Sequence, residues 1–192
     1  MRKILPIILA FISALFSNNT AFAQAGSVYT MAGGGSSTAD GVPALSSFFS
    51  SASAVATDGV GNVYVADAGR REIKKIDGAT GLIYKIAGLS ATAGTSGDGG
   101  PATAASFSGN MGGLFVTAAG DVYIADNKRI RKISSSTGII STVAGGGTSD
   151  ADGIPATLAK LNMNDVFVDA TGNLYVGSAD RVRKVDAVSG YI

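Results

Sequence analysis

Residues 61–67 read Gly-Asn-Val-Tyr-Val-Ala-Asp, and the chain repeats this stretch twice. It returns as Gly-Asp-Val-Tyr-Ile-Ala-Asp at residues 120–126 and as Gly-Asn-Leu-Tyr-Val-Gly-Ser at residues 172–178, with offsets of 59 and 52 residues. Its apolar positions are nearly continuous instead of alternating, which is typical of a strand with both faces covered. The stretch therefore predicts strands that lie in sheets stacked face to face.

Three further patterns recur with the same spacing. A basic pattern follows each copy of the first, a Thr-Gly-Ile/Leu-Ile pattern ends in Ala-Gly and has a partial early copy at residues 28–33, and the third pattern reads Asp-Gly-x-Pro-Ala. Four patterns with one period of about 55 residues indicate a repeat protein. The repeat units span approximately residues 28–88, 89–145 and 146–192.

Each unit predicts four short strands joined by tight turns. The Gly-Asn and Gly-Asp pairs between the first and second strands suit hairpin turns, because Gly and Asn tolerate positive φ. Four-stranded antiparallel sheets packed around an axis are the blades of a β-propeller, and the period is close to that of propeller repeats. We expect an all-β fold of about three blades, with an additional outer strand at residues 28–33.

The first 23 residues have the pattern of a secretory signal peptide. Arg2 and Lys3 precede an apolar run at residues 4–16, and Ala21-Phe-Ala23 is a small-x-small cleavage site. The run of 13 residues is shorter than the roughly 20 that a membrane-spanning helix needs. We expect cleavage after Ala23 and a secreted, periplasmic or cell-surface protein at residues 24–192, without a membrane attachment.

The composition excludes several kinds of chemistry. The 192 residues include no His, Cys or Trp, and the 14 acidic residues comprise 13 Asp and the single Glu72. Without His and Cys there is no Ser-His-Asp or Cys-His triad, no disulfide and no zinc or iron–sulfur cluster. The formal net charge of +1 gives no reason to expect a nucleic-acid partner.

The four patterns together resemble the NHL repeat family in its bacterial secreted form. The resemblance covers residues 27–192 and implies a β-propeller that acts as a non-catalytic binding platform. Proteins with similar blades include lyases and lactonases, so the alternative function is that of a lyase or lactone hydrolase with a carboxylate-bound metal. Their sites do not carry over, because the chain has no His and its single Glu72 lies beside a strand.

Three blades are fewer than the 4 to 8 of a closed propeller ring. We therefore interpret the sequence as part of a longer propeller that forms an open arc. The alternative is a six-bladed ring assembled from two chains. The open arc leaves two apolar blade faces exposed, which predicts self-association or poor solubility.

Basic residues gather in or beside the third strand of each unit. They could form a stripe that binds an anionic polymer such as an acidic polysaccharide. Alternatively, they lie at the rim, where their stems cover apolar neighbours and their charges remain in water. The residues are Arg70, Arg71, Lys74, Lys75, Lys128, Arg129, Arg131, Lys132, Arg181, Arg183 and Lys184.

Two sets of aspartates also allow two readings. Asp67 and Asp126 end the second strand, where they could bind a ligand or accept hydrogen bonds from the amides of their own turn. In the Asp-Gly-x-Pro-Ala segments the prolines suit a helix start, which Asp40, Asp98 and Asp152 would favour electrostatically. Calcium binding by Asp98 or Asp152 is the competing reading.

The sequence therefore predicts a secreted binding module that engages a protein or an anionic glycan. The face that carries the Asp-Gly-x-Pro-Ala connectors and the turns between second and third strands is the expected interaction surface. No cofactor, metal or catalytic residue is expected. The candidate binding residues are Asp67, Arg70, Arg71, Asp98, Asp126, Lys128, Arg129, Asp152, Asp180 and Arg181.

Overall fold

The computed structural model describes residues 28–90, 92–178 and 180–192. The expected signal peptide at residues 1–23 lies outside the described residues. The chain divides into two compact units, Met1–Thr30 and Met31–Ile192.

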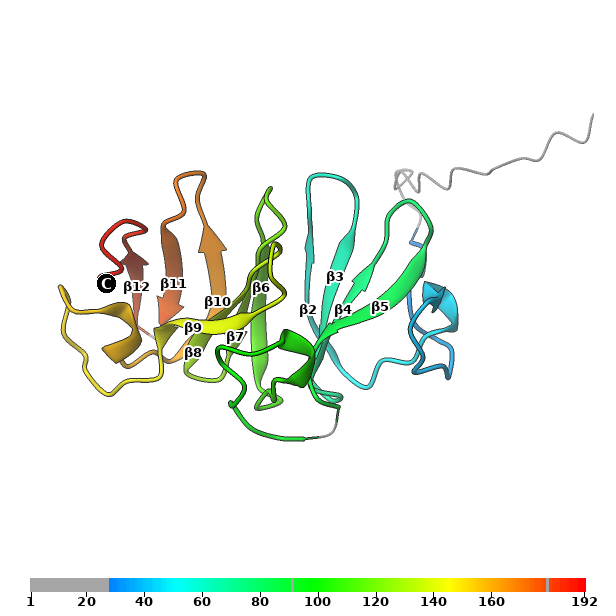
Figure 1. Cartoon of the computed structure of the whole chain (residues 1–192), viewed down its shortest axis with the longest axis horizontal. Helices are drawn as coiled ribbons and strands as arrows, with labels where there is room; N and C mark the ends of the chain where they lie inside the picture. The colour runs from blue at the N-terminus through cyan, green and yellow to red at the C-terminus, as the bar shows by residue number, and fades with distance from the viewer. Residues whose placement is uncertain (1–27, 91, 179) are drawn as a thin grey trace, which may run out of the picture. The chain divides into compact units, whose positions relative to one another are not determined.

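The second unit consists of three antiparallel sheets with only single turns of 3-10 helix (Figure 1). Each repeat unit forms one sheet, as expected from the sequence, and the sheets are open. The first sheet has the strand order β1-β5-β4-β3-β2, the second β6-β7-β8-β9 and the third β10-β11-β12. The strands are β1 (Val42–Pro43), β2 (Ala52–Thr57), β3 (Val63–Asp67), β4 (Glu72–Ile76), β5 (Leu82–Ala87), β6 (Met111–Val116), β7 (Val122–Asp126), β8 (Arg129–Ile133), β9 (Ile140–Gly145), β10 (Met163–Val168), β11 (Leu174–Ser178) and β12 (Arg181–Val185).

The three sheets lie side by side in chain order, and their first strands β2, β6 and β10 are neighbours (Figure 1). The approach of β6 to β10 depends on a glycine. A Cβ atom at Gly113 would lie 2.6 Å from the Cα atom of Asp165, a distance that real side chains do not allow. The first strands can therefore approach closely where β6 has no side chain.

The second strand of the middle sheet is covered on both faces, as the repeated stretch predicts. In β7, Val122 and Ile124 belong to a core formed with the first sheet. Their neighbours Tyr123 and Ala125 belong to a separate core formed with the third sheet. Because side chains alternate between the faces of a strand, β7 joins two hydrophobic cores.

The Asp-Gly-x-Pro-Ala segments form connectors along one end of the sheets. Each proline precedes a single turn of 3-10 helix, namely η1 (Ala44–Ser46), η2 (Ala102–Ala104) and η3 (Ala156–Leu158), so the expected helix start is confirmed only as one turn. The aspartates ahead of these turns do not cap them. Asp40 instead accepts a hydrogen bond from the Lys85 amide at 2.6 Å, and Asp98 accepts one from the Thr142 amide at 3.0 Å.

The large apolar residues of the connectors are not all buried. Phe107 and Leu161 are buried, whereas Leu45, Phe48 and Leu158 are exposed. In the first connector it is Phe49, not Phe48, that packs on the sheet.

The expected strand at residues 28–33 is wrong. These residues have no strand conformation, and they pair with no described strand. Their sequence matches β5 and β9, but each of those strands is held by the third strand of its own unit, β4 or β8. A strand-like sequence without a neighbouring strand leaves its backbone groups unpaired, so the extended ladder does not form.

Candidate functional site

Asp67 and Asp126 are fully buried at the ends of β3 and β7. Asp67 accepts hydrogen bonds from the amides of Ser50 and Ser51 at 3.0 and 2.9 Å, and from the Arg70 amide of its own turn at 3.2 Å. Asp126 accepts hydrogen bonds from the amide and the hydroxyl of Ser108 at 3.0 and 2.7 Å. Both aspartates therefore tie the incoming connector to the end of the second strand, and the amides of their own turn are a minor part of the interaction.

Arg131 of β8 is fully buried and binds the connector of its own unit. Its guanidinium donates to Oδ1 of Asp98 at 2.7 and 3.1 Å, to the Ser106 carbonyl at 2.8 Å and to the Ser96 carbonyl at 3.0 Å. Oδ2 of Asp126 lies 3.7 Å from Arg131 and accepts no hydrogen bond among the described residues. Arg131 thus joins three segments of one repeat unit.

The two carboxylates beside Arg131 respond differently to burial. Burial disfavours ionisation of Asp98, but hydrogen bonds from Thr142 and Arg131 outweigh it and hold the pKa below its ordinary value. Asp126 is more deeply buried, and the loss of hydration raises its pKa despite the hydrogen bonds from Ser108. The network therefore contains one carboxylate that is stabilised in its charged form and one that is not.

The equivalent basic residues of the other sheets are also buried. Lys74 of β4 donates to the Phe48 carbonyl at 2.8 Å. Arg183 of β12 donates to Oδ1 of Asp152 at 2.7 Å and to the Ala151 carbonyl at 2.5 Å. The expectation that these charges remain in water at a rim is wrong for this position of each unit, because the side chain points back into its connector. Asp98 and Asp152 accordingly bind arginine and not the 3-10 turn.

Glu72 adds a buried acidic group to the first sheet, at the strand position that Arg129 holds in the second. It forms an ion pair with Arg70 at 2.9 Å, lies 3.8 Å from Lys74 and accepts a short hydrogen bond from the Ser90 hydroxyl. Burial opposes its ionisation, but the bonds from Arg70 and Ser90 lower the pKa of Glu72 overall. Arg70 is therefore used within the fold.

The remaining candidate binding residues are more accessible. Arg71 has a positive φ of 59°, and its Nε is buried without a hydrogen-bond partner among the described residues. Lys128 is exposed, and Arg129 donates to the Thr95 carbonyl at 3.3 Å. Asp180 and Arg181 form an exposed ion pair with each other at 3.0 Å. Ligand binding by these residues stays a prediction.

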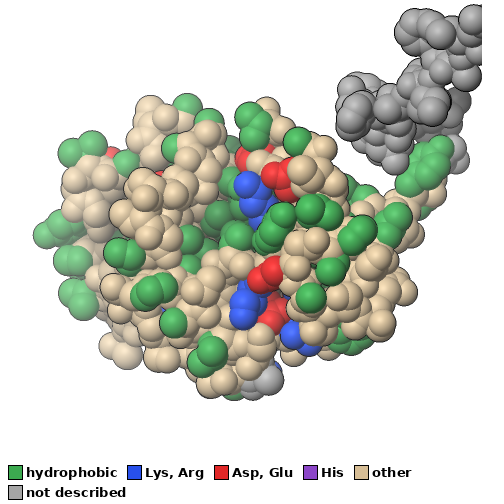
Figure 2. Space-filling view, turned by 45° about the vertical axis from the view of Figure 1, so that its right-hand side comes forward, with side chains coloured by type: hydrophobic (Ala, Val, Ile, Leu, Met, Phe, Trp, Pro, Cys, Tyr) green, Lys and Arg blue, Asp and Glu red, His purple; other side chains and the backbone are tan. Residues whose placement is uncertain are grey.

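The structure does not join the basic residues into one stripe. In Figure 2, acidic and basic side chains lie next to one another in small groups on the visible face. The alternation along β8 explains this, since Arg131 points into the connector whereas Lys132 pairs with Asp121 on the other face at 2.7 Å. The connector face therefore has mixed charge.

A groove of about 660 Å³ lies between the first two sheets, at the end opposite the connectors. Buried or partly buried apolar groups from both sheets line it, including Tyr64, Ile86, Val122 and Ile133. Polar groups of the hairpin turns complete the lining and include Asp58, Lys75, Ser134 and Ser135. An apolar surface with a few polar groups is the usual composition of a ligand site.

Lys75 is the charged group that distinguishes this groove. It lies across from Tyr64 in the strand register, with its ammonium 5.8 Å from the centre of the tyrosine ring, and has no ion-pair partner among the described residues. In the second sheet the equivalent Lys132 is neutralised by Asp121 at 2.7 Å. Asn62 stands where that aspartate would be, so the ammonium of Lys75 remains available.

The hydrogen bonds of the hairpin turn hold this end of the groove. Asp58 accepts from the amide and the side chain of Asn62 at 2.9 and 2.7 Å, and from the Tyr64 hydroxyl at 3.3 Å. Burial and the nearby carboxylate of Asp58 raise the pKa of Tyr64 to about 12. Tyr64 is thus a neutral hydrogen-bonded group at physiological pH.

The sequence alone did not identify this groove. Two features of the sequence could have indicated it. Pairing of the second and third strands places each Tyr opposite a Lys, and the first unit has Asn62 where the second unit has Asp121.

Among the described residues, no group of three or more acidic side chains is placed to hold a metal ion. Asp169 resembles Asp58 and accepts hydrogen bonds from Thr171 and Asn173 within its own turn.

No described helix is long and apolar enough to cross a membrane. A scan against protein-family models and a search of the curated proteins each found no match.

Solved structures do resemble the chain. A structural-genomics protein of unknown function from Bacteroides thetaiotaomicron is 26% identical, with a TM-score of 0.51 over 64% of this chain and 32% of that protein. The extracellular domain of BT4673 from the same organism is 11% identical, with a TM-score of 0.49 over 74% of this chain and 16% of that one. The chain therefore spans about a third of the length of the first protein, and the second similarity is too distant to carry an argument.

Proposed function

We propose that the three sheets are blades of an NHL-type β-propeller and that the chain is a secreted, non-catalytic binding module. Three observations support the propeller: one sheet per repeat unit, adjacent first strands β2, β6 and β10, and a hydrophobic core between each pair of sheets. The signal-peptide pattern of residues 1–23 supports export. A ligand of such a module lies outside the cytoplasm.

The groove beside Lys75 carries the proposal. Its apolar lining suits the C–H face of a sugar ring, and the hydroxyls of Ser134 and Ser135 suit sugar hydroxyls. The ammonium of Lys75 has no acidic partner among the described residues, so it favours a ligand that brings a negative charge. We therefore assign an anionic glycan, such as an oligosaccharide of uronic acids, to this groove. The connector face is less suited, because Asp67, Asp98 and Asp126 are occupied by bonds within the fold.

The experiment measures binding of galacturonate and glucuronate oligomers by calorimetry, with the methyl esters as neutral counterparts. A charge-assisted hydrogen bond contributes about 1.5–3 kcal/mol, so Lys75→Gln is expected to weaken binding of the acidic oligomers by about tenfold or more. The ester should bind weakly to both proteins.

Lys132→Gln is the matched control. Lys132 has the same strand position and an equivalent tyrosine neighbour, but it lies on the face toward the third sheet and is already paired with Asp121. Its replacement should leave binding unchanged. Equal losses for the two variants, equal affinity for acid and ester, or no binding of any acidic oligomer would contradict the proposal.

A further inference from the structure

The two contacts between sheets use the same strand positions. On the side that faces the preceding sheet, Leu114 of the second sheet and Val166 of the third are buried, with 7% and 4% of their surface exposed. On the side that faces the following sheet, Ile73 of the first sheet and Ile130 of the second are fully buried. The sheets thus pack by one repeated pair of faces, here named the front face and the back face.

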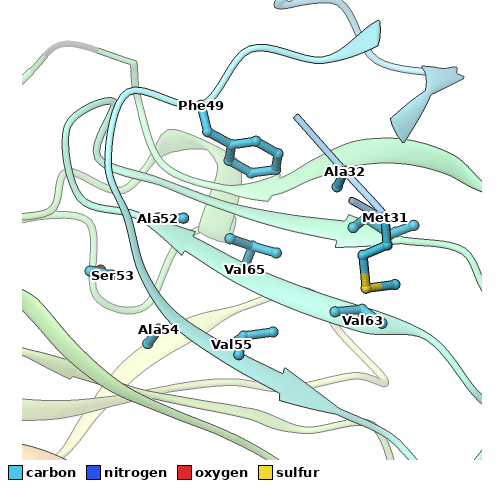
Figure 3. A pocket seen from close by; sticks show the side chains of 10 residues that line it. Met31, Ala32, Phe49, Ala52, Ser53, Ala54, Val55, Val63 and Val65 are labelled. Atoms are coloured by element: carbon cyan, nitrogen blue, oxygen red, sulfur yellow. The ribbon is translucent and has the colours of Figure 1, made fainter. Parts of the chain in front are cut away.

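No described sheet covers the front face of the first sheet, and only Met31, Ala32 and Phe49 lie against part of it. Val55 holds the position of Leu114 and Val166, as the strand register shows, yet 65% of its surface is exposed. With Val63 and Val65 it lines an apolar groove of about 300 Å³. Figure 3 shows Phe49 and Met31 reaching over this groove toward the three valines.

No described sheet covers the back face of the third sheet. Val182 holds the position of Ile73 and Ile130 and is 76% exposed. Among the described residues, the first sheet therefore lacks a preceding sheet on its front face, and the third sheet lacks a following sheet on its back face.

We infer that the front face of the first sheet binds the back face of the third sheet of a second copy of this chain. This contact would continue those already formed, because the same two faces meet twice within one chain and the two that remain are of the same kind. Contact between different faces is head-to-tail, so it closes into a ring or extends into a chain of copies. Exposed apolar patches of this sort mark interaction sites.

The first experiment measures the mass of the full chain in solution by light scattering across a range of concentrations. Assemblies of two or more copies are expected, and Val55→Arg and Val182→Glu should each reduce them to monomers. Both side chains are already exposed, so neither change should alter the circular dichroism spectrum. An equimolar mixture of the two variants should recover an assembly, because opposite charges then meet at one contact and the other contact is unchanged.

The matched control is Val188→Glu, which changes an even more exposed valine in a turn that belongs to neither face. It should leave the assembly intact. The chain has no Cys, so Val55→Cys and Val182→Cys can also be joined by a bismaleimide, whereas Val55→Cys and Val188→Cys should not be joined. A wild-type chain that is monomeric at every concentration, or assembly that survives both charged variants, would overturn the inference. Glycan binding by the Lys75 groove is a separate property and would be unaffected by either result.

Discussion

Replacement of Arg131 by Met tests whether the buried guanidinium holds the connector to the second sheet. The variant keeps the apolar stem but loses the two bonds to Asp98 and those to the carbonyls of Ser106 and Ser96. It also removes the ion-pair partner of the buried Asp126 and leaves only the weaker interaction with Arg129. Removal of one partner of a buried ion pair costs about 3–5 kcal/mol, and we expect a loss in that range.

Thermal and urea unfolding at pH 7 measure this loss. For a protein of this length, 1 kcal/mol corresponds to about 2–4 °C in Tm, so Arg131→Met should lower Tm by about 6–20 °C. Lys132→Met is the control, since its ion pair with Asp121 is partly exposed and contributes about 0–1 kcal/mol. Adding Asp126→Asn to Arg131→Met should recover part of the stability, because the uncompensated carboxylate is then absent.

If Arg131→Met is no more destabilising than Lys132→Met, the guanidinium does not hold the connector. If Asp126→Asn destabilises the Arg131→Met variant as much as it destabilises the wild type, the two residues are not coupled.

Two further predictions concern pH and export. Burial raises the pKa of Asp126 above its usual 3.8, so the folded protein holds this proton to a higher pH than the unfolded chain, and the contribution of Asp126 to stability falls as pH rises through that interval. Asp126→Asn should lack this fall. Urea unfolding of both proteins from pH 3 to pH 7 should therefore show the stability of the variant rising relative to that of the wild type as the pH increases. A stability difference that is constant over this range would contradict the prediction. If the chain is exported, amino-terminal sequencing of the secreted protein should begin at Gln24.

The repeated sequence patterns predicted the sheets well. Near-continuous apolar residues in β3 and β7 correctly indicated strands covered on both faces, because alternate side chains fill two different cores. The expected strand at residues 28–33 failed for a reason that periodicity does not contain. A strand needs a partner as well as a suitable sequence, and no described strand pairs with these residues.

The site was predicted less well, because composition alone does not say which way a charged side chain points. Arg131 alternates with Ile130 and shares its face with Ile133, so the strand pattern did place it toward a core. Reading the basic residues as one stripe overlooked that alternation. The groove beside Lys75 was missed because it depends on a contact between two sheets. It also depends on one difference between the units, since the first has Asn62 where the second has Asp121.

The described ion pairs all remain within a single repeat unit. Arg131 binds Asp98 and Asp126 of its own unit, and Arg183 binds Asp152 of its own, whereas the contacts between sheets are made mainly of apolar side chains. Duplication of the gene segment that encodes one unit would therefore copy a complete set of charges and counter-charges. The new unit would meet its neighbours through surfaces that tolerate substitution by other apolar residues. The number of units can thus change during evolution without leaving a buried charge unpaired.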